Sequence, residues 1–136
     1  MNRTFAKDYT FGTTSEVNTL SAIQSLDPTI QRNTDKYALF DYSGNNVNVE
    51  LKTRNNAKDK YPTTMIGYNK VKIAEQNPNL TYYFAFKYTD GLYYIKYNKE
   101  LFDTFEVKEG GRWDRGRPEL NQYCYIPVDK LTLLVA

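Results

Sequence analysis

The chain has 136 residues, of which 40% are hydrophobic and 25% charged, a composition that suits one domain spanning residues 1–136 with its own buried core. The formal net charge of +2 permits nucleic-acid binding without arguing for it, and the absence of histidine excludes histidine-dependent serine or cysteine catalysis and histidine-ligated zinc. Any chemistry must therefore use carboxylates, lysines and hydroxyls, together with a hard cation that prefers oxygen ligands.

The N-terminal residues, MNRTFAKDYTFG, contain no apolar run of the kind found in a secretory signal. No stretch reaches the roughly 20 apolar residues that a membrane helix needs. We therefore expect an intracellular, cytoplasmic protein that has no membrane partner.

A first helix is expected at Thr14–Leu26, ended by Asp27-Pro28. Its apolar residues recur every three positions, at Val17, Leu20, Ile23 and Leu26. Thr13 and Glu16 have the spacing of a capping box. Glu16 also lies near the apolar stripe, where an unpaired carboxylate is costly. Two interpretations of Glu16 stay open, a capping residue and a third carboxylate leaning over the segment that follows.

Two strands are expected next, at Tyr37–Ser43 and Val47–Arg54, joined by the turn-forming residues Gly44-Asn45-Asn46. Because side chains alternate along a strand, Glu50 and Lys52 share one face of the second strand.

The turn decides where Asp41 lies. A turn centred on Asn45-Asn46 places Asp41 opposite Glu50, and one centred on Gly44-Asn45 places it diagonal to Glu50. A three-residue turn would place Asp41 on the other face. Carboxylates facing each other repel, and a divalent cation would compensate, with Lys52 near enough to steady a water or a phosphate. The alternative is an ordinary ion pair on the surface of a hairpin.

The rest of the chain predicts further elements in alternation. They are a polar loop at Asn55–Pro62, a helix at Thr64–Gln76, strands at Leu80–Tyr88 and Leu92–Tyr97, a short helix at Lys99–Phe105, a glycine-rich loop at Glu109–Pro118, a strand at Tyr123–Ile126 and an apolar segment at Leu131–Val135. Cys124 lies in an apolar run, which predicts burial. The order indicates an α/β (α+β) fold with a central mixed β-sheet flanked by helices, and the aromatic residues on both faces of its strands indicate that both faces are covered.

At these residues the sequence resembles the PD-(D/E)XK nuclease superfamily. Phe40-Asp41-Tyr42 supplies the aspartate strand, with Phe40 in place of the family's proline, and Glu50-Leu51-Lys52 supplies the (D/E)-x-K strand. Glu16 matches a glutamate that the family often has on its first helix. The resemblance implies a restriction-endonuclease-like αβββαβ core, and the small size is similar to that of phage or viral resolvases and intron endonucleases.

The resemblance also implies roles for individual residues. Asp41, Glu50 and the Leu51 carbonyl would coordinate Mg²⁺, for which Mn²⁺ would substitute, and Glu16 would contact it through water or hold a second ion. Lys52 would orient the attacking hydroxide. Lys70, on the second expected helix, is an additional active-site candidate, and a solvated helix lysine is the alternative.

Two basic segments are candidates for DNA contacts, and ordinary solvated loops are the alternative for both. They contain Arg54, Lys58 and Lys60 after the motif strand, and Arg112, Trp113, Arg115 and Arg117 in the glycine-rich loop. The predicted function is a metal-dependent DNA endonuclease, structure-selective or site-specific. The alternative is a non-catalytic nucleic-acid-binding or accessory module on the same fold. Symmetric cutting of two strands would require a homodimer.

Overall fold

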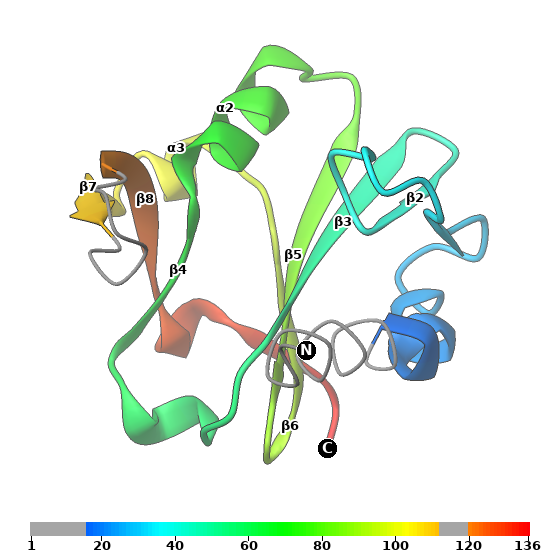
Figure 1. The fold of residues 1–136 in the computed structure, drawn as a ribbon, viewed down its shortest axis with the longest axis horizontal. Helices are drawn as coiled ribbons and strands as arrows, with labels where there is room; N and C mark the ends of the chain where they lie inside the picture. Colours follow the sequence, from blue (N-terminus) through cyan, green and yellow to red (C-terminus); the bar gives the residue numbers. More distant parts are fainter. Residues whose placement is uncertain (1–15, 112–119) are drawn as a thin grey trace, which may run out of the picture.

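The computed structural model describes residues 16–111 and 120–136, whose arrangement is shown in Figure 1. Six strands form one sheet in the order β1-β2-β3-β5-β6-β9, and three form a second in the order β4-β8-β7. The first sheet consists of Gln31–Arg32 (β1), Tyr42–Gly44 (β2), Val47–Thr53 (β3), Thr81–Tyr88 (β5), Gly91–Lys96 (β6) and Thr132–Val135 (β9). The second consists of Thr63–Gly67 (β4), Glu106–Gly111 (β7) and Leu120–Pro127 (β8).

The described residues contain few helices. They are residues 16–23, Tyr68–Gln76 (α2) and Lys99–Phe102 (α3), with single 3₁₀ turns at Lys58–Lys60 (η1) and Val128–Lys130 (η3). Within the described ranges we find no helix with the length and apolar character needed to cross a bilayer. The fold is therefore mixed α/β, as the sequence predicts, and contains few helices.

The central sheet is mixed because β3 and β5 run parallel, whereas the other strand pairs are antiparallel. A parallel pair needs a long crossover, which β4 and α2 supply here. The register places Glu50 beside Phe84 and Lys52 beside Phe86. The motif strand is thus an interior strand of the sheet, and the expected central mixed sheet is confirmed.

Apolar residues cover both faces of this sheet. Side chains of β5 alternate between two clusters, with Phe84 and Phe86 in the cluster that includes α2 and α3, and Ala85 in the cluster that includes Ile23 of the first helix. Figure 1 accordingly shows α2 and α3 on the side of the second sheet and helix 16–23 on the other side of β3. Glu50 belongs to the face that carries Phe84, so the motif residues face the space between the two sheets.

The first helix differs from its prediction. It ends at residue 23, because the following turn is tightened by hydrogen bonds from Ser25 to Ala22 and from Leu26 to Ile23. Val17, expected on the buried stripe, is 54% exposed. Thr13, the partner of the expected capping box, lies outside the described residues.

The segment before the hairpin is also different. Of the expected strand Tyr37–Ser43, only Tyr42 and Ser43 are β-structure, and β2 extends from them to Gly44. The carboxylate of Asp35 accepts a hydrogen bond from the Tyr37 backbone N–H, and this local turn replaces the strand. The short β1, which the sequence did not predict, pairs with β2 instead.

The expected helix Thr64–Gln76 is wrong in its first turn. Residues Thr63–Gly67 form β4, and Ile66 is buried opposite Cys124 of β8. The helix begins only at Tyr68 because Gly67 has the extended conformation of an N-cap. The predicted burial of Cys124 is confirmed.

The last third of the chain holds more strand than expected. The helix at Lys99–Phe105 ends at Phe102, and Glu109–Gly111, assigned to a loop, belong to β7. β8 begins at Leu120, earlier than the expected Tyr123, because its residues from Leu120 to Tyr125 pair with β7. Residues 112–119 lie outside the described part.

Candidate active site

The turn between β2 and β3 sets the geometry of the site. Gly44 pairs with Val47 and Tyr42 with Val49, so Asn45 and Asn46 are the two central residues. Asn46 has a φ of 62°, a conformation that asparagine tolerates better than most residues. The turn centred on Asn45-Asn46 is therefore the correct alternative. Asp41, which directly precedes Tyr42 in the chain, lies on the Glu50 side of the hairpin.

Asp41 is held against the motif strand by its own carboxylate. Its Oδ2 accepts a hydrogen bond of 2.8 Å from the backbone N–H of Leu51. Its carbonyl accepts a second one, also of 2.8 Å, from the backbone N–H of Asn33. The carboxylate is thus fixed beside the backbone that carries Glu50 and Lys52.

Glu50 is the buried member of the group, with 7% of its surface exposed. Its Oε2 lies 3.8 Å from Lys52 Nζ and 3.9 Å from Lys70 Nζ. Burial, and secondarily the negative charge of Asp41, raise the pKa of Glu50 to about 7, although the two lysines act in the opposite direction. The site therefore holds a carboxyl group that ionises near neutral pH.

Lys70 reaches this group from α2. Its ammonium donates a hydrogen bond to the Leu39 carbonyl and lies 4.8 Å from the centroid of the Phe40 ring. The sequence predicts Lys70 on the second helix, and it does lie on α2, although the residues expected to start that helix form β4. The structure nevertheless brings Lys70 next to Glu50.

Glu16 lies at the far side of Asp41. Its Oε2 accepts a hydrogen bond of 3.1 Å from Nε of Arg32, and both side chains are about one quarter exposed. Burial, and next the charge and a hydrogen bond of Asp41, raise the pKa of Glu16. The backbone carbonyl of Glu16 also accepts a hydrogen bond from the hydroxyl of Tyr42, which anchors this end of the helix to β2.

The carboxylates of Glu16, Asp41 and Glu50 therefore form a row in which Asp41 interacts with both others. Among the described residues, no three acidic or cysteine side chains converge closely enough to form a complete metal-binding group. The donor set still fits a hard divalent cation, because Asp41 and Glu50 present neighbouring oxygen ligands and the charge of Asp41 raises the pKa of Glu50. Asp41, Glu50 and the neighbouring Leu51 carbonyl could hold such an ion, with water or substrate in its remaining positions.

Arg32 is a member of the site that the sequence did not predict. It stands on β1, a strand of two residues, and pairs with a glutamate 16 residues earlier in the chain. Such a short strand has no periodicity, so the sequence offers no signal for it.

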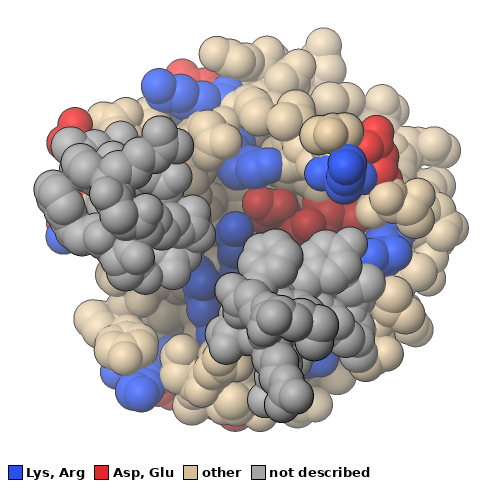
Figure 2. Space-filling view, in the orientation of Figure 1, with Lys and Arg blue, Asp and Glu red and all other residues tan. Residues whose placement is uncertain are grey.

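The residues predicted to contact DNA after the motif strand each have a neighbour within the protein. Lys58 pairs with Asp59 at 3.1 Å, and Lys60 lies 5.5 Å from the centroid of the Tyr61 ring. Arg54 donates hydrogen bonds to β4. The second predicted group, Arg112, Trp113, Arg115 and Arg117, lies outside the described residues. Figure 2 shows Lys and Arg side chains in a column down this face, bordering a recessed acidic patch.

Comparison with known proteins gives one match. The model of a family described as "Phage putative PDDEXK endonuclease" matches residues 14–134. No curated protein and no solved structure matches the chain. The matched range contains every residue of the site described above.

Proposed function

The chain belongs to this phage PD-(D/E)XK endonuclease family, and from that premise we propose that it is a metal-dependent endonuclease that hydrolyses phosphodiester bonds in DNA. The observation that supports the proposal most directly is the setting of Glu50. A buried carboxyl group lies beside the fixed carboxylate of Asp41 and 3.8 Å and 3.9 Å from two lysine ammoniums, so one small site offers oxygen ligands to a hard cation and positive charge to a phosphate.

We propose Mg²⁺ as the natural cation and expect Mn²⁺ to substitute. Asp41, Glu50 and the Leu51 carbonyl would hold it, and Glu16 would contact it through water. When bound, the cation would polarise the phosphate and lower the pKa of a coordinated water. The protein's own contribution is to fix Asp41 through the Leu51 N–H and to keep Glu50 shielded from bulk water.

Lys52 is proposed to orient the attacking water and to stabilise the charge that develops on the phosphate. Its side chain is 41% exposed, so it can reach a substrate, whereas the Lys70 side chain is 18% exposed. Lys70 is held by the Leu39 carbonyl and the Phe40 ring, so we assign it a positioning role toward Glu50.

The proposal is tested by cleavage of supercoiled plasmid and of branched DNA with Mg²⁺, Mn²⁺ or EDTA. We expect the wild type to cut only with metal, and Asp41→Ala and Lys52→Ala to lose cutting. Lys108→Ala is the matched control, because Lys108 is an exposed lysine that pairs with Glu106 in the second sheet. Equal cutting by all four proteins, or cutting in EDTA, would refute the proposal.

A non-catalytic DNA-binding or accessory module is the second candidate. The observation that favours it is the lack, among the described residues, of a complete three-acid metal group. It predicts DNA binding without cutting, and Asp41→Asn would leave that binding unchanged.

For the nuclease we propose action in the cytoplasm. Symmetric cuts in two strands would require a homodimer, which analytical ultracentrifugation with and without DNA would test.

A further inference from the structure

A pocket of about 380 Å³ lies beside the motif strand, between the end of β3 and β4. Its walls include Arg54, Tyr61, Thr64, Met65 and Tyr88. The ten lining residues include neither aspartate nor glutamate, and Arg54 brings a guanidinium group to the wall, so the pocket favours a neutral or anionic ligand. The volume is within the range of small-molecule sites, about 300–1,000 Å³. We name it the Arg54–Tyr88 pocket.

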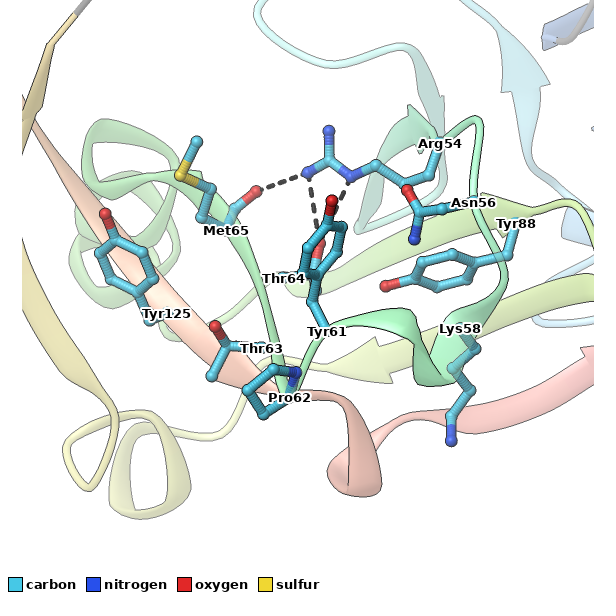
Figure 3. A pocket seen from close by; sticks show the side chains of 10 residues that line it. All are labelled: Arg54, Asn56, Lys58, Tyr61, Pro62, Thr63, Thr64, Met65, Tyr88 and Tyr125. Atoms are coloured by element: carbon cyan, nitrogen blue, oxygen red, sulfur yellow. Dashed lines mark hydrogen bonds between the residues drawn. The ribbon is translucent and has the colours of Figure 1, made fainter.

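Tyr88 gives the pocket an unsatisfied polar group. The residue is only 5% exposed, and among the described residues its hydroxyl has no hydrogen-bond partner. A buried hydroxyl without a partner is costly, at roughly 1–3 kcal/mol. Figure 3 shows this hydroxyl directed toward Thr64 and Tyr61, two residues that line the pocket. A ligand that hydrogen-bonds there would remove the cost.

Tyr61 offers an aromatic ring for stacking, and Arg54 offers a positive charge. Tyr61 is 53% exposed and presents its ring at the pocket, where a flat ligand could stack on it. Arg54 is fixed because Nη2 donates to the Met65 carbonyl at 2.8 Å and both Nε and Nη2 lie near the Thr64 hydroxyl. The third guanidinium nitrogen takes no part in these bonds (Figure 3). In the same view the Lys58 ammonium points away from the pocket.

The pocket lies further along the chain segment that carries Glu50 and Lys52. The Arg54 backbone N–H donates to the Lys87 carbonyl, so the chain stays extended past β3 and Arg54 continues the face of Glu50 and Lys52. Arg54 is four residues beyond Glu50, about 13 Å along an extended strand. That distance corresponds to roughly four base steps of B-DNA. A DNA strand that is held at Glu50 and runs along β3 would therefore reach the pocket.

These observations point to one ligand. We propose that the Arg54–Tyr88 pocket receives a single unpaired nucleobase of the DNA strand bound at Glu50, with the base stacked on Tyr61, hydrogen-bonded to the Tyr88 hydroxyl and its phosphate near Arg54. A nucleobase has the flat face, the edge of donors and acceptors and the adjacent anion that these three residues can contact. The inference rests on the proposed function and extends it to a substrate class, DNA that carries an unpaired base near the cut.

The test is fluorescence anisotropy with labelled duplexes in EDTA, which prevents metal-dependent cleavage. One duplex is fully paired, and the other has the same sequence with one extra, unpaired purine. We expect the wild-type protein to bind the second roughly tenfold more tightly, the range expected for stacking of one base on an aromatic ring.

Variants at two positions, Tyr61 and Tyr88, assign that preference to the pocket. Tyr61→Ala should remove most of it, whereas Tyr61→Phe should keep it because the ring remains. Tyr88→Phe should reduce it by roughly two- to tenfold, the value of one hydrogen bond. The matched control is Tyr83→Phe, a tyrosine of the same strand that belongs to the opposite face of the sheet.

Thermal melting distinguishes this role from a structural one. Tyr88→Phe removes a buried hydroxyl that has no partner in the described structure, so we expect no loss of melting temperature. Equal binding of both duplexes by the wild type, or an unchanged preference in both Tyr61→Ala and Tyr88→Phe, would overturn the inference. If the protein cuts DNA with metal but binds both duplexes equally, only the proposal for the pocket is rejected. If it prefers the duplex with the unpaired purine but does not cut DNA, only the proposed nuclease activity is rejected.

Discussion

The carboxylate of Asp41 accepts a 2.8 Å hydrogen bond from the backbone N–H of Leu51, the central residue of the Glu50-Leu51-Lys52 strand. This contact joins the two halves of the motif through the main chain and does not depend on a metal. It places a second negative charge beside Glu50, which is already buried. The repulsion between the two carboxyl groups is therefore part of the folded structure, and the first two predictions follow from it.

The charge of Asp41 can be removed while its hydrogen bond is kept. Asp41→Asn retains an oxygen that can accept from the Leu51 N–H but no longer repels Glu50. We expect Mg²⁺-dependent DNA cleavage to fall by roughly 10²-fold or more, since the cation loses a charged ligand. We expect the melting temperature in EDTA to stay the same or rise.

Asp129→Asn is the matched control, because Asp129 is exposed in η3 and distant in the chain from the hairpin. It should leave both cleavage and melting unchanged. Wild-type cleavage by Asp41→Asn would contradict a role of this carboxylate in metal binding. A large loss of melting temperature would show that the charge stabilises the fold.

The stability of the metal-free protein should depend on pH through Glu50. Its pKa is raised from an ordinary value of 4.5 to about 7, so between these values the folded state binds more protons than the unfolded state. The contribution of Glu50 to the free energy of unfolding should therefore be largest below pH 4.5 and should fall as the pH rises toward 7. The loss is on the order of 2–3 kcal/mol.

Urea unfolding in EDTA at several pH values between 5 and 8 measures this dependence. Glu50→Gln should flatten it, because the amide does not titrate. Added Mg²⁺ should stabilise the wild type more at pH 8 than at pH 6, since metal binding needs the ionised carboxylate. An identical pH slope in wild type and Glu50→Gln would rule out Glu50 as its source.

Lys70 is expected to act through Glu50. Replacing it with alanine removes a positive charge 3.9 Å from Oε2, so the Glu50 carboxylate should form only at higher pH. We predict about a tenfold loss of kcat/KM at neutral pH, and an acid limb of the pH–rate profile that moves to higher pH.

Lys70→Arg should restore part of the activity by restoring the charge. Lys72→Ala is the control on the same helix, because Lys72 is exposed and its ammonium lies over Tyr68. A uniform loss of rate with an unchanged pH profile would indicate that Lys70 only supports the packing of α2.

Local signals in the sequence predicted the turns of the two hairpins well. Each turn contains a positive φ angle, which only a few residue types adopt easily. The φ angle is 62° at Asn46 in one turn and 152° at Gly91 in the other. Side-chain alternation then placed Glu50 and Lys52 on one face, and the turn brought Asp41 to it. This part of the site is encoded within about a dozen consecutive residues, so it could be found without the structure.

The rest of the site depends on contacts that no short segment encodes. β4 was predicted as the start of a helix because its partner, β8, lies about 60 residues later in the chain. The ion pair of Glu16 with Arg32 requires β1, whose two residues have no pattern of their own. The Arg54–Tyr88 pocket forms between the two sheets, so no periodicity within one strand indicates it.

The position of Asp41 should depend on Gly44, because this residue lets the hairpin pack against the preceding loop. A Cβ added to Gly44 would lie 2.6 Å from the Thr29 hydroxyl oxygen and 2.9 Å from the Ile30 backbone nitrogen. Since backbone cannot move aside as a side chain can, Gly44→Ala should destabilise the protein by about 1–3 kcal/mol. It should also lower cleavage, because Asp41 reaches the motif strand only through this hairpin.

Asn46→Gly is the comparison in the same turn. Glycine adopts positive φ more easily than asparagine, so this variant should match or exceed wild-type stability and keep full cleavage. Urea unfolding and plasmid cleavage measure both effects. If Gly44→Ala is as stable and active as the wild type, the close packing of the turn against Thr29 does not control the site. If Asn46→Gly is inactive, the side chain of Asn46 has a role beyond the backbone conformation.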